Sequence, residues 1–125
     1  MVNELTTSLP KYQNLFSKII IMDGAMHNWE TINTGQPKIV KNQFANDEKY
    51  FNEWSPWAWA ERADMDQTEV FIIEGLMVDY NTRYYEHLQE LGAKVEKVSP
   101  NCLHDVRCIQ NTYGIEAFEF LASRN

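Results

Sequence analysis

Apolar residues fall into short runs along the chain, and each run is bounded by residues that favour turns. Continuous β-branched runs, which predict buried strands, alternate with runs that have helical spacing. The predicted strands are 19–22, 38–41, 69–75, 94–98 and 115–121, and the predicted helices are 10–17, 47–65, 79–91 and 103–113. This alternation is typical of an α/β fold.

The clearest unit runs from 69 to 121 as strand, helix, strand, helix and strand. Its first helix has apolar residues at helical spacing from Tyr80 to Leu91, and Gly92 follows where a C-terminal helix glycine belongs. A crossover of about a dozen residues makes the strands that it joins parallel. We therefore expect a three-layer α/β sandwich with a mostly parallel sheet, built as a single domain over 1–125.

The middle third of the chain carries the net charge of −7. Range 42–79 has nine acidic and two basic residues. Range 1–41 has three acidic and four basic residues, and range 80–125 has six acidic and five basic residues. Phosphate backbones are repelled by such a surface, so nucleic acid is not an expected ligand. Hydrophobic residues make up 44% of the chain, which excludes intrinsic disorder.

The first residues lack the basic start and apolar stretch of a secretory signal. We therefore expect a cytoplasmic protein in which Cys102 and Cys108 are reduced thiols. No apolar run approaches the roughly 20 residues that cross a bilayer, so a membrane is not an expected partner. The isolated glycines form no phosphate-binding loop, and we predict no cofactor and no resident metal.

Ligands of parallel α/β sheets bind beyond the carboxyl ends of the strands. In this chain the predicted strand ends indicate four stretches that are candidates for a functional site. They are 23–27, Lys41, 75–81 and 99–104.

These stretches also carry a family resemblance. The segment FIIEGLMVDYNTRYYEHLQELGAKVEKVSPNCLHD resembles the second half of the isochorismatase-like cysteine hydrolases, a superfamily that includes the nicotinamidases. Asp23, which follows the strand 19–22, resembles the aspartate of that family, and Lys41 with Phe44 resembles its lysine and short aromatic motif. The resemblance covers about half of the chain and implies a small isochorismatase-like variant of the α/β sandwich.

The resemblance implies a mechanism in which the aspartate takes a thiol proton, the lysine orients groups or stabilises charge, and the thiolate attacks a carbonyl. The matching positions are Asp23, Lys41 and Asn81, so an amide stands where the family has its nucleophilic cysteine. We therefore expect a pocket that holds a small amide- or carboxylate-type ligand without cysteine-dependent turnover. The predicted pocket residues are Met77, Val78, Asp79, Phe44 and Trp57.

Plainer interpretations stay open for these residues. Asp79 or Asn81 can cap a helix, Asp23 can belong to a turn, and Lys41 can be an exposed strand end. Cys102, His104 and Cys108 can contribute to a zinc site with a ligand such as His27, or Cys102 can be a nucleophile with His104 as its base. They can equally be buried cysteines and a surface histidine.

The tryptophan-rich segment supports a different function. Three tryptophans between 54 and 59 cannot share one helical face, so at least one is expected to be exposed or to lie at an interface. Packing between subunits, and hence a homo-oligomer, is the first expectation. The alternative is a non-enzymatic acidic inhibitor that uses 47–69 to bind a protein partner by charge complementarity.

Overall fold

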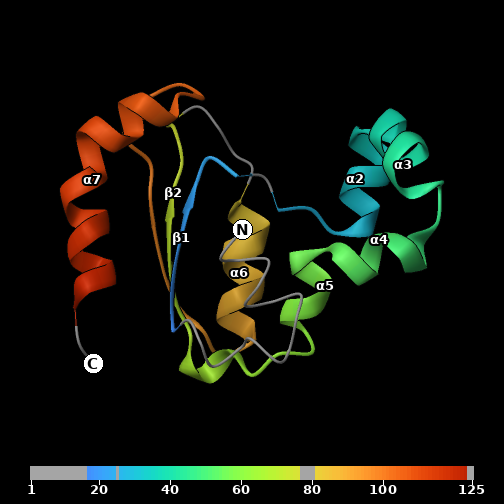
Figure 1. Ribbon diagram of the computed structural model, residues 1–125, viewed down its shortest axis with the longest axis horizontal. Coiled ribbons are helices and arrows are strands. Elements are labelled where there is room, and N and C mark those ends of the chain that lie inside the picture. Colours follow the sequence, from blue (N-terminus) through green and yellow to red (C-terminus); the bar gives the residue numbers. More distant parts are fainter. Residues whose placement is uncertain (1–16, 25, 77–80, 124–125) are drawn as a thin grey trace.

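The computed structural model describes residues 17–24, 26–76 and 81–123, and it has a mixed α/β fold. Figure 1 shows a small parallel sheet with helices beside it. The elements are β1 (Lys18–Met22), α2 (Trp29–Gly35), α3 (Pro37–Phe44), α4 (Glu48–Trp54), α5 (Pro56–Ala60), the 3-10 helix η2 (Met65–Gln67), β2 (Glu69–Ile73), α6 (Thr82–Glu90), β3 (Lys94–Val98) and α7 (Val106–Ala122).

The sheet has the strand order β1-β2-β3, and both strand pairs are parallel. Ile20 lies opposite Phe71 on β2, and Phe71 lies opposite Glu96 on β3. β2 is the central strand, and its last four residues are buried, as its continuous apolar run predicts. The prediction of parallel strands within 19–22, 69–75 and 94–98 is therefore confirmed.

Helices α6 and α7 pack against opposite faces of the sheet (Figure 1). Alternate strand residues face each helix, because neighbouring side chains of a strand point to opposite sides. The α6 face is formed by Ile19, Ile21, Val70 and Ile72 with Tyr84 and Leu88, and the α7 face by Phe71 and Ile73 with Ile109 and Ala117.

Helices α2, α3 and α4 form a separate cluster to one side of the sheet (Figure 1). Its buried residues are Ile32, Val40 and Phe51, and Phe44 packs edge-on against Phe51 with ring centroids 5.1 Å apart. Asp47 caps α4 by accepting from the backbone N–H of Lys49 and Tyr50. The predicted break of 47–65 at Ser55-Pro56 is confirmed, because α4 ends before it and α5 begins at Pro56.

Two predicted strands are wrong, because both segments are helical. Residues 38–41 lie inside α3, which Pro37 opens at a position where its fixed φ suits a helix. Residues 115–121 lie inside α7, which runs through Gly114 instead of ending there. An interior glycine costs a helix about 1 kcal/mol, and packing of Ile109 and Ala117 on the sheet offsets that cost. Residues 10–16 of the predicted first helix lie outside the described residues.

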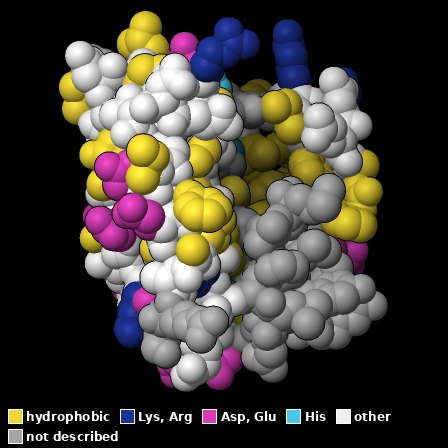
Figure 2. Space-filling view, turned by 60° about the vertical axis from the view of Figure 1, so that its left-hand side comes forward, with side chains coloured by type: hydrophobic (Ala, Val, Ile, Leu, Met, Phe, Trp, Pro, Cys, Tyr) yellow, Lys and Arg dark blue, Asp and Glu magenta, His cyan; other side chains and the backbone are white. Residues whose placement is uncertain are grey.

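The outer side of α7 is exposed and partly apolar. Ile115 and Phe118 have exposed fractions of 73% and 71%. Figure 2 turns this side of the molecule forward and shows hydrophobic and acidic side chains next to one another. Among the described helices, none has the length and apolar character needed to cross a membrane.

The expectation of reduced thiols is wrong for this structure, because Cys102 and Cys108 form a disulfide. Asp105 caps α7 by accepting from the backbone N–H of Arg107 and Cys108. The first turn of the helix thereby brings Cys108 to a Cα–Cα distance of 5.8 Å from Cys102, which suits a disulfide.

Candidate functional site

Buried polar residues gather at the carboxyl edge of the sheet. Asp23 follows β1, Glu74 follows β2, and Asn81 precedes α6, and all three are buried. Lys97 of β3 and His104 of the following loop contact two of them. We call these five residues, Asp23, Glu74, Asn81, Lys97 and His104, the polar edge. Its position is the one at which parallel α/β sheets bind ligands.

The first pair of the polar edge is Glu74 with Lys97. The Glu74 side chain is fully buried, and its Oε1 lies 3.1 Å from Lys97 Nζ. The Lys97 side chain is 21% exposed, so this ion pair joins a buried carboxylate to a partly exposed side chain. A buried carboxylate is costly without a partner, and this ion pair supplies one.

Asn81 links the segments that follow β1 and β2. Its Nδ2 donates to Glu74 Oε2 at 3.2 Å and to Gly24 O at 2.6 Å, and its Oδ1 accepts from Met26 N at 3.2 Å. Both amide N–H groups are thus engaged, and the side chain does not cap α6. Asn81 occupies the N-cap position of α6 but makes no capping hydrogen bond with its side chain, because its amide binds Glu74 and the loop after β1 instead.

The second pair of the polar edge is Asp23 with His104. Asp23 Oδ1 accepts from the backbone N–H of Gly75 at 2.9 Å, and Oδ2 lies 3.4 Å from His104 Nδ1. The Asp23 side chain is 1% exposed, whereas that of His104 is 59% exposed. As in the first pair, a buried carboxylate contacts a nitrogen group that reaches solvent.

Gly75 allows the loop after β3 to lie against the end of β2. A Cβ at this position would be 2.1 Å from the carbonyl oxygen of Cys102, so no larger residue fits without movement of the loop. The backbone N–H of Leu76 donates to the carbonyls of Pro100 and Cys102 at 2.8 and 3.1 Å. These contacts fix the loop that carries His104.

The structure does not bring all of the predicted site residues together. Lys41 is exposed on α3, away from the sheet (Figure 1), because the segment is helical and not a strand that ends at the sheet. Phe44 packs against Tyr50 and Phe51 within the helical cluster. Met77, Val78 and Asp79 lie outside the described residues.

Trp57 lies on α5 and is used in packing. Its ring stacks on His87 at a centroid distance of 4.4 Å, and it contacts Tyr84 of α6. Neither Cys102 nor Cys108 is a thiolate in this structure, so the hypotheses of a cysteine nucleophile and a cysteine zinc ligand are wrong for it. Within the described ranges, no group of three or more candidate residues could hold a metal ion.

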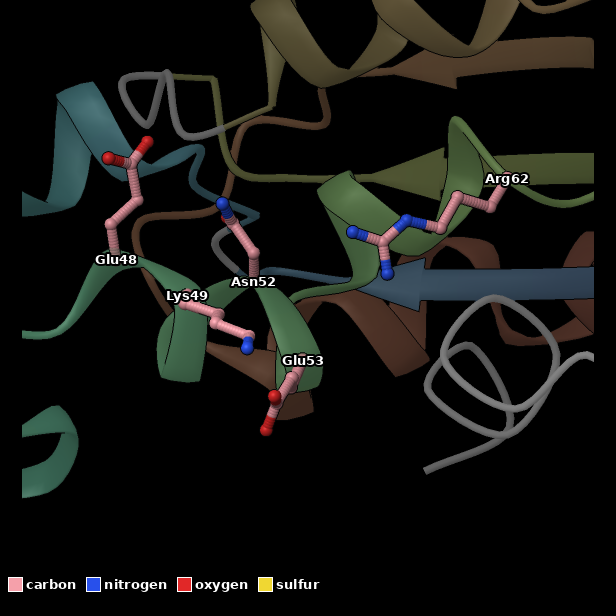
Figure 3. Close-up of a pocket in the computed structure, with 5 residues that line it drawn as sticks. All are labelled: Glu48, Lys49, Asn52, Glu53 and Arg62. Carbon is pink, nitrogen blue, oxygen red and sulfur yellow. The ribbon is translucent and has the colours of Figure 1, made fainter.

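A surface hollow of about 420 Å³ lies away from the polar edge. Figure 3 shows its lining residues on α4 and the segment after α5, with Arg62 extending towards Asn52. The lining is formed by Glu48, Lys49, Asn52, Glu53 and Arg62. Trp54 of the same helix is 62% exposed, as expected for at least one tryptophan of this segment.

Sequence reasoning did not single out Glu74 or Lys97. The available signal was a charged residue at the end of an otherwise apolar run, EVFIIEG, because a carboxylate buried there needs a cation nearby. Lys97 lies opposite Ile72 in the register, one position before the end of β3, and so reaches that carboxylate. The sequence predicts roles for His104 only together with Cys102 and Cys108, whereas in the structure His104 contacts Asp23.

The fold and the polar edge thus define a small parallel α/β protein whose buried carboxylates lie at the carboxyl edge of the sheet. Comparison with known proteins adds no relative: no family model matches the chain, and neither a curated protein nor a solved structure matches it.

Proposed function

We propose that this protein binds a small amide- or carboxylate-type ligand at the polar edge, in an isochorismatase-like three-layer arrangement and without cysteine-dependent turnover. The observation that carries the proposal is the repeated pairing of a buried carboxylate with a more exposed nitrogen group. The Lys97 side chain beside Glu74 is 21% exposed, and the His104 side chain beside Asp23 is 59% exposed. The Lys97 ammonium is a hydrogen-bond donor, and amides and carboxylates share the oxygen acceptor that it would bind.

Asn81 supports this function as a positioning residue. Its amide nitrogen is not a useful nucleophile, and its hydrogen bonds to Glu74 and Gly24 already use both donors. It therefore holds the Glu74 carboxylate towards Lys97 instead of attacking a carbonyl. Lys41 has no part in this proposal, because it lies on α3.

The test is ligand binding by wild type and by Lys97→Gln, with nicotinamide and benzoate as probes. Glutamine keeps a hydrogen-bond donor for Glu74 and removes the cation. Loss of a charged hydrogen bond predicts binding weaker by about tenfold or more. Lys94→Gln, at the opposite end of the same strand, is the matched control and should bind like wild type. Thermal shift and calorimetry provide the measurement. Absence of binding to wild type, or equal binding by Lys97→Gln, would contradict the proposal.

A second candidate function is protein binding through α4. Trp54 and Tyr50 have exposed fractions of 62% and 42%, and acidic Glu48 and Glu53 lie on the same helix. A basic partner would meet both aromatic and negative groups there. Titration with an oligolysine peptide should change tryptophan fluorescence at low salt, and the change should weaken steeply as salt increases. Trp54→Phe should abolish the signal, and a salt-independent or absent response would contradict this function.

Two further expectations stay predictions. A homo-oligomer is expected from the tryptophan-rich segment, and sedimentation would measure it. A cytoplasmic location is expected from the sequence, although cytoplasmic reductants would open the Cys102–Cys108 disulfide.

A further inference from the structure

The Asp23–His104 pair places an exposed imidazole beside a buried carboxylate at the polar edge. Asp23 Oδ1 is held by the Gly75 N–H at 2.9 Å, which turns Oδ2 towards His104 Nδ1 at 3.4 Å. The pair joins a carboxylate that is 1% exposed to an imidazole that is 59% exposed. In catalytic dyads and triads, a buried carboxylate orients a histidine whose opposite ring nitrogen faces the reactants.

The backbone of Asp23 has an uncommon conformation next to this contact. Its φ of 52° lies in the left-handed region, which few residues with a Cβ adopt and which aspartate tolerates better than most. The Asp23 N–H donates to the carbonyl of Ile73 at 3.0 Å, and this bond fixes the turn over the end of β2. Strained residues that surrounding contacts maintain are concentrated at functional sites.

The loop that carries His104 is also held by contacts with its neighbours. The loop that carries His104 is bonded to Leu76 on one side, and the Cys102–Cys108 disulfide joins it to α7 on the other. Asp105, the next residue, caps α7. These contacts hold the backbone of His104 close to Asp23. The 3.4 Å separation is long for a hydrogen bond, and such contacts often tighten when a ligand binds.

We propose that His104 is a general base that activates water against the carbonyl of an ester or amide bound at the polar edge. His104 Nε2 takes a proton from water as the water oxygen bonds to the carbonyl carbon. The tetrahedral intermediate then expels the alcohol or amine, which receives that proton, and a carboxylic acid is released. Asp23 is a positioning residue that keeps the proton on Nδ1, so that Nε2 accepts. The step needs no cysteine, and it rests on the proposed function.

The experiment measures hydrolysis of p-nitrophenyl acetate and binding of nicotinamide by the same protein preparations. His104→Gln keeps a polar side chain at this position but has no basic nitrogen. It should lose about 10²-fold in hydrolysis and keep nicotinamide binding, because general-base catalysis contributes at least about that factor. The control is His87→Gln. His87 Nε2 also faces a carboxylate, Glu61, at 3.5 Å, but it lies beside Trp57 and away from the polar edge. This variant should hydrolyse like wild type.

The variant Asp23→Asn tests whether Asp23 orients the His104 ring or only stabilises the fold. The ring ¹⁵N shifts of His104 should report a proton on Nδ1 in wild type and a mixture of tautomers in the variant, with hydrolysis reduced at least tenfold. A wild-type protein that binds nicotinamide but hydrolyses no faster than His104→Gln would overturn this inference and leave the proposed function intact. A wild-type protein that does not bind would overturn both. Unchanged ring shifts in Asp23→Asn would remove the role of Asp23.

Discussion

The sheet with α6 and α7 and the cluster of α2, α3 and α4 bury different kinds of residue. The sheet unit has an extensive apolar core on both faces of β2 and the polar edge at one end. The helical cluster buries Ile32, Val40 and Phe51 only, and among its described residues no charged side chain is buried. A large apolar core can sustain the cost of buried carboxylates, whereas a small one cannot. We infer that this is why the candidate chemistry lies on the sheet.

The largest expected effect is on the core of the sheet unit. Ile72→Ala should lower the free energy of unfolding by about 2–5 kcal/mol, because Ile72 is fully buried on the central strand and a cavity would remain. Ile32→Ala in the helical cluster should cost about 2 kcal/mol, since a small cluster at the surface can close around the change. Urea unfolding measures both, and an equal or larger loss for Ile32→Ala would contradict this contrast.

The next effect concerns the polar edge. Asn81→Ala should lower the free energy of unfolding by about 3 kcal/mol, because Glu74 and Met26 N both lose a partner and each such loss costs about 1–3 kcal/mol. Asn111→Ala, at an exposed position on α7, is the matched control and should be near neutral. If Asn81→Ala is also neutral in denaturant unfolding, the amide does not hold the strand ends together.

Loss of the disulfide should have a similar or slightly smaller effect. Replacement of Cys102 and Cys108 by serine removes a crosslink over a sequence separation of 6, and such short loops contribute about 2 kcal/mol. The same loss should follow reduction of the wild-type protein with dithiothreitol. Calorimetry of the oxidised, reduced and serine forms makes the comparison. A reduced form as stable as the oxidised form would rule out a stabilising crosslink here.

The smallest expected effect is the pH dependence contributed by His27, in the loop that joins β1 to the helical cluster. Burial lowers the pKa of His27 below 6.5, so the folded protein disfavours the proton that the unfolded chain accepts. Its contribution to stability is therefore complete above about pH 6.5 and is lost as the pH falls. His27→Gln should flatten the decline of the free energy of unfolding between about pH 7 and 5. Identical slopes in both proteins would contradict the assignment.

Predictability from sequence also differs between the two regions. The apolar runs at 19–22 and 69–75 predicted the sheet, because a strand buried on both faces leaves a continuous signature. Range 38–41 has too few residues to distinguish strand from helix, and packing with Val40 inward decided it. The prediction of a strand at 115–121 is wrong because a glycine such as Gly114 often ends a helix, whereas here the packing of α7 on the sheet outweighs the cost of the glycine.

The location of the candidate site could be predicted from the sequence, but not all of the residues that form it. Strand ends indicated Asp23 and the stretch that contains Asn81 and Gly75, and the structure connects them through hydrogen bonds. The pairings with Lys97 and His104 depend on strand register and on a loop fixed by a disulfide. Neither property has a local sequence pattern, so a single sequence does not reveal them.

The most direct test of the central claim is to map nicotinamide binding by two-dimensional ¹H–¹⁵N NMR. If the polar edge binds the ligand, the largest shift changes should fall on the amides of Gly75, Asn81 and His104, with little change on α4. Shift changes centred on Glu48, Lys49 and Arg62, or no saturable change at any amide, would contradict the account.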